Sequence, residues 1–267
     1  MEMLLVNVAL FISIVVVFVT ALFLVMQTKG DNSLIDIAYG PLFFFSSLTL
    51  LLLINIYTPL VIIMLTCIGM WSLRLAYRIF TKNYGKGEDE RYKNWRIQWT
   101  KRGNIYFVVR SFLQINFLQG IIITLVALPF ILATTTKETS LPVLVYLGVV
   151  IFAIGFLIEV IADKQLDAFL AKKKAGTTTE PIMKTGLFRY SRRPNYFGET
   201  LIWWGLAVMV LPLHYGYLAL ISPLLITYIV VYITGPMLEK IFIDRYGEQY
   251  KTYMLETSYF IPLPPKR

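Results

Sequence analysis

Residues 3–26, MLLVNVALFISIVVVFVTALFLVM, form an almost unbroken apolar run. A bilayer has a hydrocarbon core about 30 Å thick, which an α-helix crosses with roughly 20 apolar residues. The run exceeds that length. No basic segment precedes it and no small-residue cleavage site follows it, so we interpret it as a membrane-spanning helix rather than a cleavable signal peptide.

The rest of the chain repeats this pattern. Of its 267 residues, 57% are hydrophobic and 15% are charged, whereas a soluble domain has about 45–50% apolar and 25% charged residues. Mean hydropathy is +0.65. We therefore predict an all-α polytopic membrane protein that forms one domain over residues 1–267, with about seven transmembrane helices. Beyond the first, they are expected at about 37–54, 58–80, 106–133, 141–162, 196–212 and 216–236.

The basic residues predict the topology. Of 25 lysines and arginines, all except Lys137 fall on one side of a seven-span layout. Basic loops stay in the cytoplasm, so we expect an outside N-terminus and a cytoplasmic C-terminus. The cytoplasmic segments are then 81–105, 164–195 and 237–267. This topology explains the net charge of +9, and no nucleic-acid partner is expected.

Several kinds of chemistry are disfavoured by what the sequence lacks. Cys67 and His214 are the only cysteine and histidine, so neither a disulfide framework nor a metal site is expected. No G-x-G-x-x-G turn is present, so a Rossmann domain is not how a dinucleotide would be held.

Polar residues occur inside two predicted spans, where they are costly and usually face a bundle interior or cavity. Glu159 and Asp163 are four residues apart and share a helix face, as do Asn195, Glu199 and Trp203. Two polar faces thus lie at the cytoplasmic ends of neighbouring spans. The simpler interpretation is that they are solvated helix ends.

Arginines surround the second polar face, in the stretch GLFRYSRRPNYFGETLIWWG at 186–205. A guanidinium binds phosphate oxygens bidentately, and a helix N-terminus offers free N–H groups. An anionic cofactor at this cytoplasmic border is our hypothesis. Phospholipid headgroups would satisfy the same arginines.

The stretch 186–205, together with EVIADKQLDAF at 159–169, resembles the steroid 5α-reductase family, as do GEDERYKNWR at 87–96 and FLQG at 117–120. The resemblance implies an NADPH-dependent membrane reductase. It would reduce the carbon–carbon double bond of a lipophilic α,β-unsaturated ketone, such as a Δ4-3-ketosteroid.

The resemblance also implies site residues. Asp163, Asn195 and Glu199 would line the nicotinamide and ribose, and basic side chains would hold the phosphates. The implied cofactor-binding set is Arg91, Tyr92, Glu159, Asp163, Lys172, Lys173, Arg189, Arg192, Arg193, Asn195, Tyr196, Glu199, Glu239, Tyr246 and Tyr250.

The implied catalytic residues depart from the family pattern. A second-helix glutamate and a third-helix tyrosine act in the steroid enzymes; here Asp36 and Trp71 stand at those positions. An indole donates a hydrogen bond but is no proton donor. Tyr39 is therefore expected to act with Asp36, and the predicted substrate contacts are Trp71, Gln119 and Trp203.

Two alternatives stay open. The tail LEKIFIDRYGEQYKTYMLETSYFIP at 238–262 is similar to tails of isoprenylcysteine carboxyl methyltransferases, which implies S-adenosylmethionine instead of NADPH. Arg193 replaces the histidine of the usual Arg-His-Pro-Asn-Tyr motif, which favours a phosphorylated cofactor. The other alternative is a lipid-binding protein without catalysis. The expected location is a bacterial inner membrane, or the endoplasmic reticulum in a eukaryote.

Overall fold

The computed structural model describes residues 1–83, 85 and 87–266, so positions 84 and 86 of the predicted loop 81–105 lie outside the described residues. Within this part of the chain every regular element is helical. Six helical stretches are long and apolar enough to cross a membrane, which confirms the prediction of a polytopic all-α protein. They are α1 (Glu2–Lys29), α2 (Leu34–Ile54), α3 (Pro59–Asn83), Asn104–Val126, α8 (Val143–Lys174) and Gly216–Tyr246.

The predicted span 196–212 forms a shorter helix, α9 (Pro194–Val210). Its 17 residues are at the lower limit for crossing a bilayer. Local sequence explains where other spans end. Gly30 takes the left-handed conformation after α1, and Asn55 takes it after α2, since both residue types tolerate positive φ.

The helices differ from the sequence-based spans in three places. The span 106–133 is broken at Ala127, between Asn104–Val126 and α7 (Leu128–Ala133). The segment 164–195 begins as helix, because α8 continues to Lys174, and 81–105 contains α4 (Glu90–Thr100). Hydropathy marks only where a helix is apolar. Helices continue past that point, because lysine, glutamine and leucine are good helix formers.

Helix packing divides the chain into two compact units: Met1–Pro142 with Pro212–Leu218, and Val143–Leu211 with Ala219–Arg267. The first unit contains α1–α7. Here α1 packs against α2 and α6, and α2 packs against α3. The Asn7 amide donates to the Thr134 hydroxyl over 2.9 Å, a buried bond that joins the start of α1 to the end of α7.

The helix Asn104–Val126 contains a π-helical turn, η1 (Phe112–Phe117), between α5 (Asn104–Ser111) and α6 (Leu118–Val126). A π-turn inserts an extra residue and shifts which side chains face inward. Asn116 is completely buried as a result, whereas Gln119 is only half-buried.

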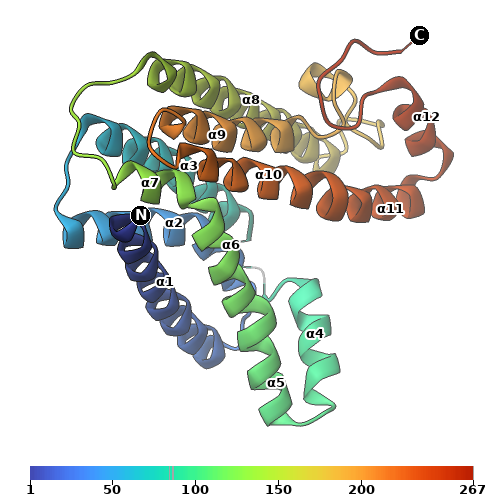
Figure 1. The fold of residues 1–267 in the computed structure, drawn as a ribbon. Coiled ribbons are helices and arrows are strands. Elements are labelled where there is room, and N and C mark those ends of the chain that lie inside the picture. The colour runs from blue at the N-terminus through green and yellow to red at the C-terminus, as the bar shows by residue number, and fades with distance from the viewer. Residues whose placement is uncertain (84, 86, 267) are drawn as a thin grey trace. The chain divides into compact units, whose positions relative to one another are not determined.

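The second unit is built on two antiparallel helices, α8 and α9, which lie side by side (Figure 1). Glycines seven residues apart line both contact faces. A Cβ added to Gly155 would lie 2.6 Å from the Gly198 carbonyl oxygen, and one added to Gly148 would lie 2.6 Å from the Gly205 oxygen. The helix backbones therefore touch directly. We refer to Gly148, Gly155, Gly198 and Gly205 as the glycine seam.

Beyond α9, a longer helical stretch runs through α10 (Ile221–Tyr228), the π-turn η4 (Ile229–Thr234) and α11 (Gly235–Tyr246). A short helix, α12 (Glu248–Glu256), and an extended tail follow (Figure 1). The tail returns to the chain before α9, where the Leu263 N–H donates to the Tyr190 carbonyl over 3.0 Å.

The glycine seam leads to the first testable prediction. Gly155→Ala and Gly198→Ala should each destabilise the protein by about 1–3 kcal/mol, because the new methyl group would overlap backbone atoms that cannot move aside. Thermal unfolding in detergent measures the change as a lowered Tm. Ile154→Ala, at an exposed position of the same helix, is the control and should have the smaller effect. Wild-type Tm values for both glycine variants would contradict a tight seam.

Candidate functional site

The N-terminus of α9 is the centre of the candidate site in the second unit. Arg193 is the N-cap residue and Pro194 the first helical residue, where proline is preorganised for a helix. The Ser191 hydroxyl accepts a hydrogen bond from the Arg193 N–H over 3.0 Å and donates to the Phe260 carbonyl over 2.7 Å. The tail thereby fixes the turn from which α9 starts.

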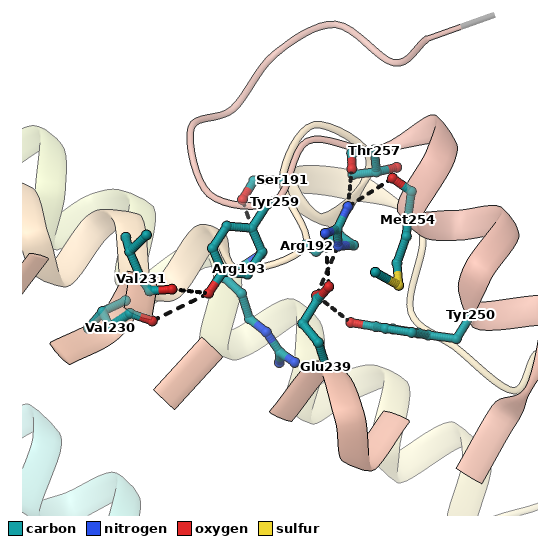
Figure 2. A network of polar contacts seen from close by, with 10 residues as sticks. All are labelled: Ser191, Arg192, Arg193, Val230, Val231, Glu239, Tyr250, Met254, Thr257 and Tyr259. Carbon is teal, nitrogen blue, oxygen red and sulfur yellow. Dashed lines mark hydrogen bonds and ion pairs between the residues drawn. The ribbon is translucent and has the colours of Figure 1, made fainter. Parts of the chain in front are cut away.

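Arg192 is buried in a protein-only network (Figure 2). Its Nε and Nη2 donate to the two carboxylate oxygens of Glu239 over 3.0 and 2.9 Å. Its Nη1 donates to the carbonyls of Met254 and Thr257. The Tyr250 hydroxyl donates to Glu239 over 2.9 Å. Because protein groups use the Arg192 guanidinium, the geometry does not favour its predicted contact with a cofactor phosphate.

Arg193, the next residue, has the opposite surroundings. Its Nε and Nη2 atoms are buried, and neither has a hydrogen-bond partner among the described residues. The guanidinium carbon lies 4.8 Å from the centre of the Phe242 ring and 6.0 Å from that of Tyr196. Aromatic faces hold the cation in place without neutralising it. Two buried guanidinium nitrogens therefore remain for an acceptor that the described residues do not provide.

Buried acids of α8 lie at the same end of this helix pair. A Cβ on Gly198 would lie 2.7 Å from the Glu159 backbone nitrogen, so Glu159 packs against α9 at Gly198. Asp163 follows one turn later, toward the beginning of α9. Both α8 acids are buried, and Asn195 and Glu199 are half-buried. The structure thus brings together the two polar faces inferred from sequence, and their roles stay predictions.

Other predicted cofactor residues of this unit are on or near its surface. Lys172, Lys173 and Arg189 are exposed. Lys173 donates to the Pro181 carbonyl over 2.8 Å and lies 5.0 Å from the centre of the Tyr246 ring. Tyr246 therefore contacts the end of α8. Trp203 is buried within α9.

The pKa of Tyr250 depends on burial and on the charges of the Arg192 network. Burial raises the pKa of this phenol to about 12, and the Glu239 charge adds to the effect, which Arg193 and Arg192 oppose. The hydroxyl is therefore protonated at neutral pH and donates to Glu239. This role stabilises the tail and uses the Tyr250 hydroxyl that we predicted for cofactor binding.

A second polar cluster lies in the first unit. Asp36, near the start of α2, accepts hydrogen bonds from the Tyr92 hydroxyl over 2.7 Å and from Arg91 Nη2 over 3.0 Å. Asp89 caps α4 by accepting from the Arg91 N–H over 3.0 Å. Burial, followed by the Asp36 charge, raises the pKa of Tyr92 far above its ordinary value. Sequence reasoning gave Asp36 and Tyr92 separate tasks, but they are hydrogen-bonded partners.

Aromatic residues adjoin this cluster along α2 and α3. Tyr39, the predicted partner of Asp36, lies with its ring centre 5.1 Å from that of Phe43 and 6.1 Å from that of Trp71. Trp71 is buried. The predicted catalytic tyrosine and the predicted substrate-binding tryptophan are therefore neighbours.

Glu88 fastens α4 to the turn between α1 and α2. It accepts from Arg96 Nη2 over 2.8 Å and Nε over 2.9 Å, and from the Asn32 N–H over 2.8 Å. Burial of the carboxyl raises its pKa, but these hydrogen bonds outweigh burial and lower the pKa of Glu88 below its ordinary value. In the described residues no cluster of three or more histidine, cysteine, aspartate or glutamate side chains could hold a metal ion.

Comparison with known proteins identifies the family to which the chain belongs. The profile of a family described as a protein of unknown function, DUF1295, matches residues 22–257. The chain belongs to the DUF1295 family. The match covers α2 through α12 and so includes both polar clusters.

Two relatives of this DUF1295 protein are similar over part of their length. An uncharacterized protein of Schizosaccharomyces pombe is 29% identical over 166 residues, 56% of this chain and 48% of that protein. The steroid 5-alpha-reductase DET2 of Gossypium hirsutum is 44% identical over 62 residues, 23% of each chain. The matches therefore span about half and about a quarter of these relatives. No solved structure matches the chain.

The Arg192 network gives a stability prediction for this DUF1295 protein. Arg192→Ala should destabilise it by about 3–5 kcal/mol, because Glu239 would be left buried without its countercharge. Thermal unfolding measures the loss as a lowered Tm. Arg245→Ala removes an exposed arginine of α11 and should change the Tm little. Equal effects of the two substitutions would refute a structural ion pair.

The Glu88 contacts give a pH prediction. The folded-state pKa of Glu88 lies below its unfolded value, so its stabilisation is present above the ordinary glutamate pKa of about 4.3 and is lost as pH falls through the lowered value. Amides of α4 should exchange with deuterium roughly three- to tenfold more slowly in wild type than in Glu88→Gln at pH 7, as expected for about 1 kcal/mol. At pH 3 the exchange rates of the α4 amides in the two proteins should become similar. A difference independent of pH would be inconsistent with a carboxylate contact.

Proposed function

We propose that this protein is an NADPH-dependent membrane reductase that reduces the carbon–carbon double bond of a lipophilic α,β-unsaturated ketone, such as a Δ4-3-ketosteroid. One observation carries the cofactor assignment: Arg193 has two buried guanidinium nitrogens without protein acceptors at the N-terminus of α9. An unmatched cation at the positive end of a helix dipole suits a phosphate. The partial similarity to a steroid 5-alpha-reductase supports a reductase over a methyltransferase.

The residues around Arg193 fit the rest of a dinucleotide. Arg193 would hold a phosphate oxygen, with exposed Lys172 and Arg189 adding positive charge. Glu159 and Asp163 are acceptors suited to ribose hydroxyls and a carboxamide, and Asn195 can both donate and accept. NADPH bound there would supply the hydride.

The predicted proton-handling residues, Asp36 and Tyr39, belong to the first unit. Reduction of an enone places negative charge on the carbonyl oxygen, which requires a hydrogen-bond donor or an acid. The Tyr92 hydroxyl donates its one hydrogen to Asp36, and Arg91 also donates to Asp36, so these two groups hold the Asp36 carboxylate in place. Tyr39 remains the other predicted proton-handling residue. The proposed location is an inner or endoplasmic reticulum membrane with the cofactor side in the cytoplasm.

Cofactor binding is the sharpest test. NADPH should raise the Tm of the purified protein more than S-adenosylmethionine does. Arg193→Gln should weaken NADPH binding roughly 10- to 100-fold, since a charged hydrogen bond contributes about 1.5–3 kcal/mol. Arg193→Lys should retain part of the affinity, because it keeps the charge but not the planar fork. Arg245→Gln, on exposed α11, is the charge-matched control and should bind like wild type.

The outcomes separate the competing functions. NADPH consumption with a Δ4-3-ketosteroid, followed by absorbance at 340 nm, would support the complete proposal. Preferential stabilisation by S-adenosylmethionine would indicate a methyltransferase instead. If neither cofactor binds, and the Arg193 variants differ only in affinity for vesicles of anionic phospholipid, the protein is a lipid-binding protein and the proposal is wrong.

A further inference from the structure

The π-turn η1 of the first unit has no role in the proposed reduction. In π-helical geometry residue i pairs with residue i+5, so Ser111 and Asn116 lie on one face about one turn apart. Both are completely buried. π-Turns are often found at functional sites, because they insert a side chain that a regular helix would direct elsewhere.

Neither polar group on this face is satisfied by the protein. The Asn116 Oδ1 and Nδ2 atoms and the Ser111 Oγ atom have no hydrogen-bond partner among the described residues. Leaving such a buried group unmatched is destabilising. The cost persists in a hydrocarbon environment, where water is absent. Three unmatched and completely buried polar atoms at one place in this helix therefore indicate a ligand.

The segment of α1 that faces Ser111 and Asn116 is apolar. Helix α1 runs antiparallel to the η1–α6 stretch: the Phe112 and Phe23 ring centres are 5.2 Å apart, and a Cβ on Gly120 would lie 3.3 Å from a Val15 methyl group. Asn116 lies between these two contacts along the helix. It is thus level with the segment of α1 between Val15 and Phe23, in which no side chain is charged.

An apolar groove lies between α1 and α6, and Val19, in the α1 segment level with Asn116, is part of its lining. Its volume is about 240 Å³, and α1 and α6 form its two sides. Phe117, directly after Asn116, and Gly120, one turn further, are part of its lining. Glycine at position 120 lets α1 and α6 approach closely at one edge. An elongated hydrocarbon fits such a groove.

We infer that Ser111 and Asn116 form the hydrogen-bonding end of a binding site for an uncharged lipid alcohol, whose hydrocarbon body lies in the groove between α1 and α6. An amide presents both a donor and an acceptor, and a hydroxyl also does both. A ketone only accepts, so it would leave Asn116 Oδ1 unmatched. A charged headgroup would be buried at these residues without a countercharge, at high cost. Binding at this site does not depend on NADPH, so it can be tested separately from the proposed reductase activity.

Photo-crosslinking in phosphatidylcholine nanodiscs tests the site. The probe is hexadecanol carrying a diazirine in its chain, and the competitors are hexadecanol, 2-hexadecanone and hexadecane. We expect labelled peptides from α1 and α6, with hexadecanol competing at least tenfold better than the ketone or the alkane. Equal competition by the alkane, or better competition by the ketone, would overturn the inference, and this comparison needs only the wild-type protein.

Variants provide the second measurement. Asn116→Leu should reduce labelling at least tenfold and should also raise the Tm without ligand, because an apolar side chain of similar size replaces an unmatched amide. Ser111→Ala should have a smaller effect in the same direction. Gln114→Leu, on the same π-turn but only half-buried, is the matched control and should label like wild type. Undiminished labelling of Asn116→Leu, or a lowered Tm with no preference for the alcohol, would refute the site.

Discussion

The direct backbone contact between α8 and α9 is the constraint on which the second unit depends. Two helices can approach this closely only where neither has a side chain, and the glycine seam provides this at matched heptad positions. The seam fixes the register of the pair, so Glu159 lies opposite Gly198 and the acids of α8 lie near the start of α9. Lipid offers little hydrophobic driving force between helices, so close van der Waals packing must hold them together.

In the dipeptide Arg192–Arg193, different surroundings give two identical side chains different roles. Arg192 bonds to Glu239 and to two carbonyls. The Glu239 countercharge offsets the cost of burying the guanidinium. Arg193 packs against aromatic rings and keeps two guanidinium nitrogens available. Arg192 connects the C-terminal tail to the turn before α9. The anchored tail in turn supports Arg193. Structural and ligand-directed roles are thus adjacent in the chain but differ in their surroundings.

Sequence patterns predicted the helical membrane fold because apolar runs report lipid exposure directly. They also predicted that Glu159 and Asp163 share one helix face and Asn195 and Glu199 another, at the same end of two neighbouring helices, and their roles stay predictions. The partners of Arg192 could not be predicted, because Glu239 and Thr257 are distant in the chain and no periodicity connects them. Asn116 was missed for another reason: a regular helical repeat does not foresee the π-turn that buries it. Hydropathy misplaced helix ends, because polar residues continue a helix as readily as apolar ones.

The Arg192 network also has a consequence for biosynthesis. Its hydrogen-bond partners lie 47, 62 and 65 residues downstream. At about 5–20 residues per second, the ribosome needs roughly 3–13 s to produce the last of them after Arg192 itself. During that interval α8 and α9 can associate through their glycines, but the guanidinium must stay hydrated. The Arg192 network of the second unit is therefore completed only when Thr257 has been synthesised.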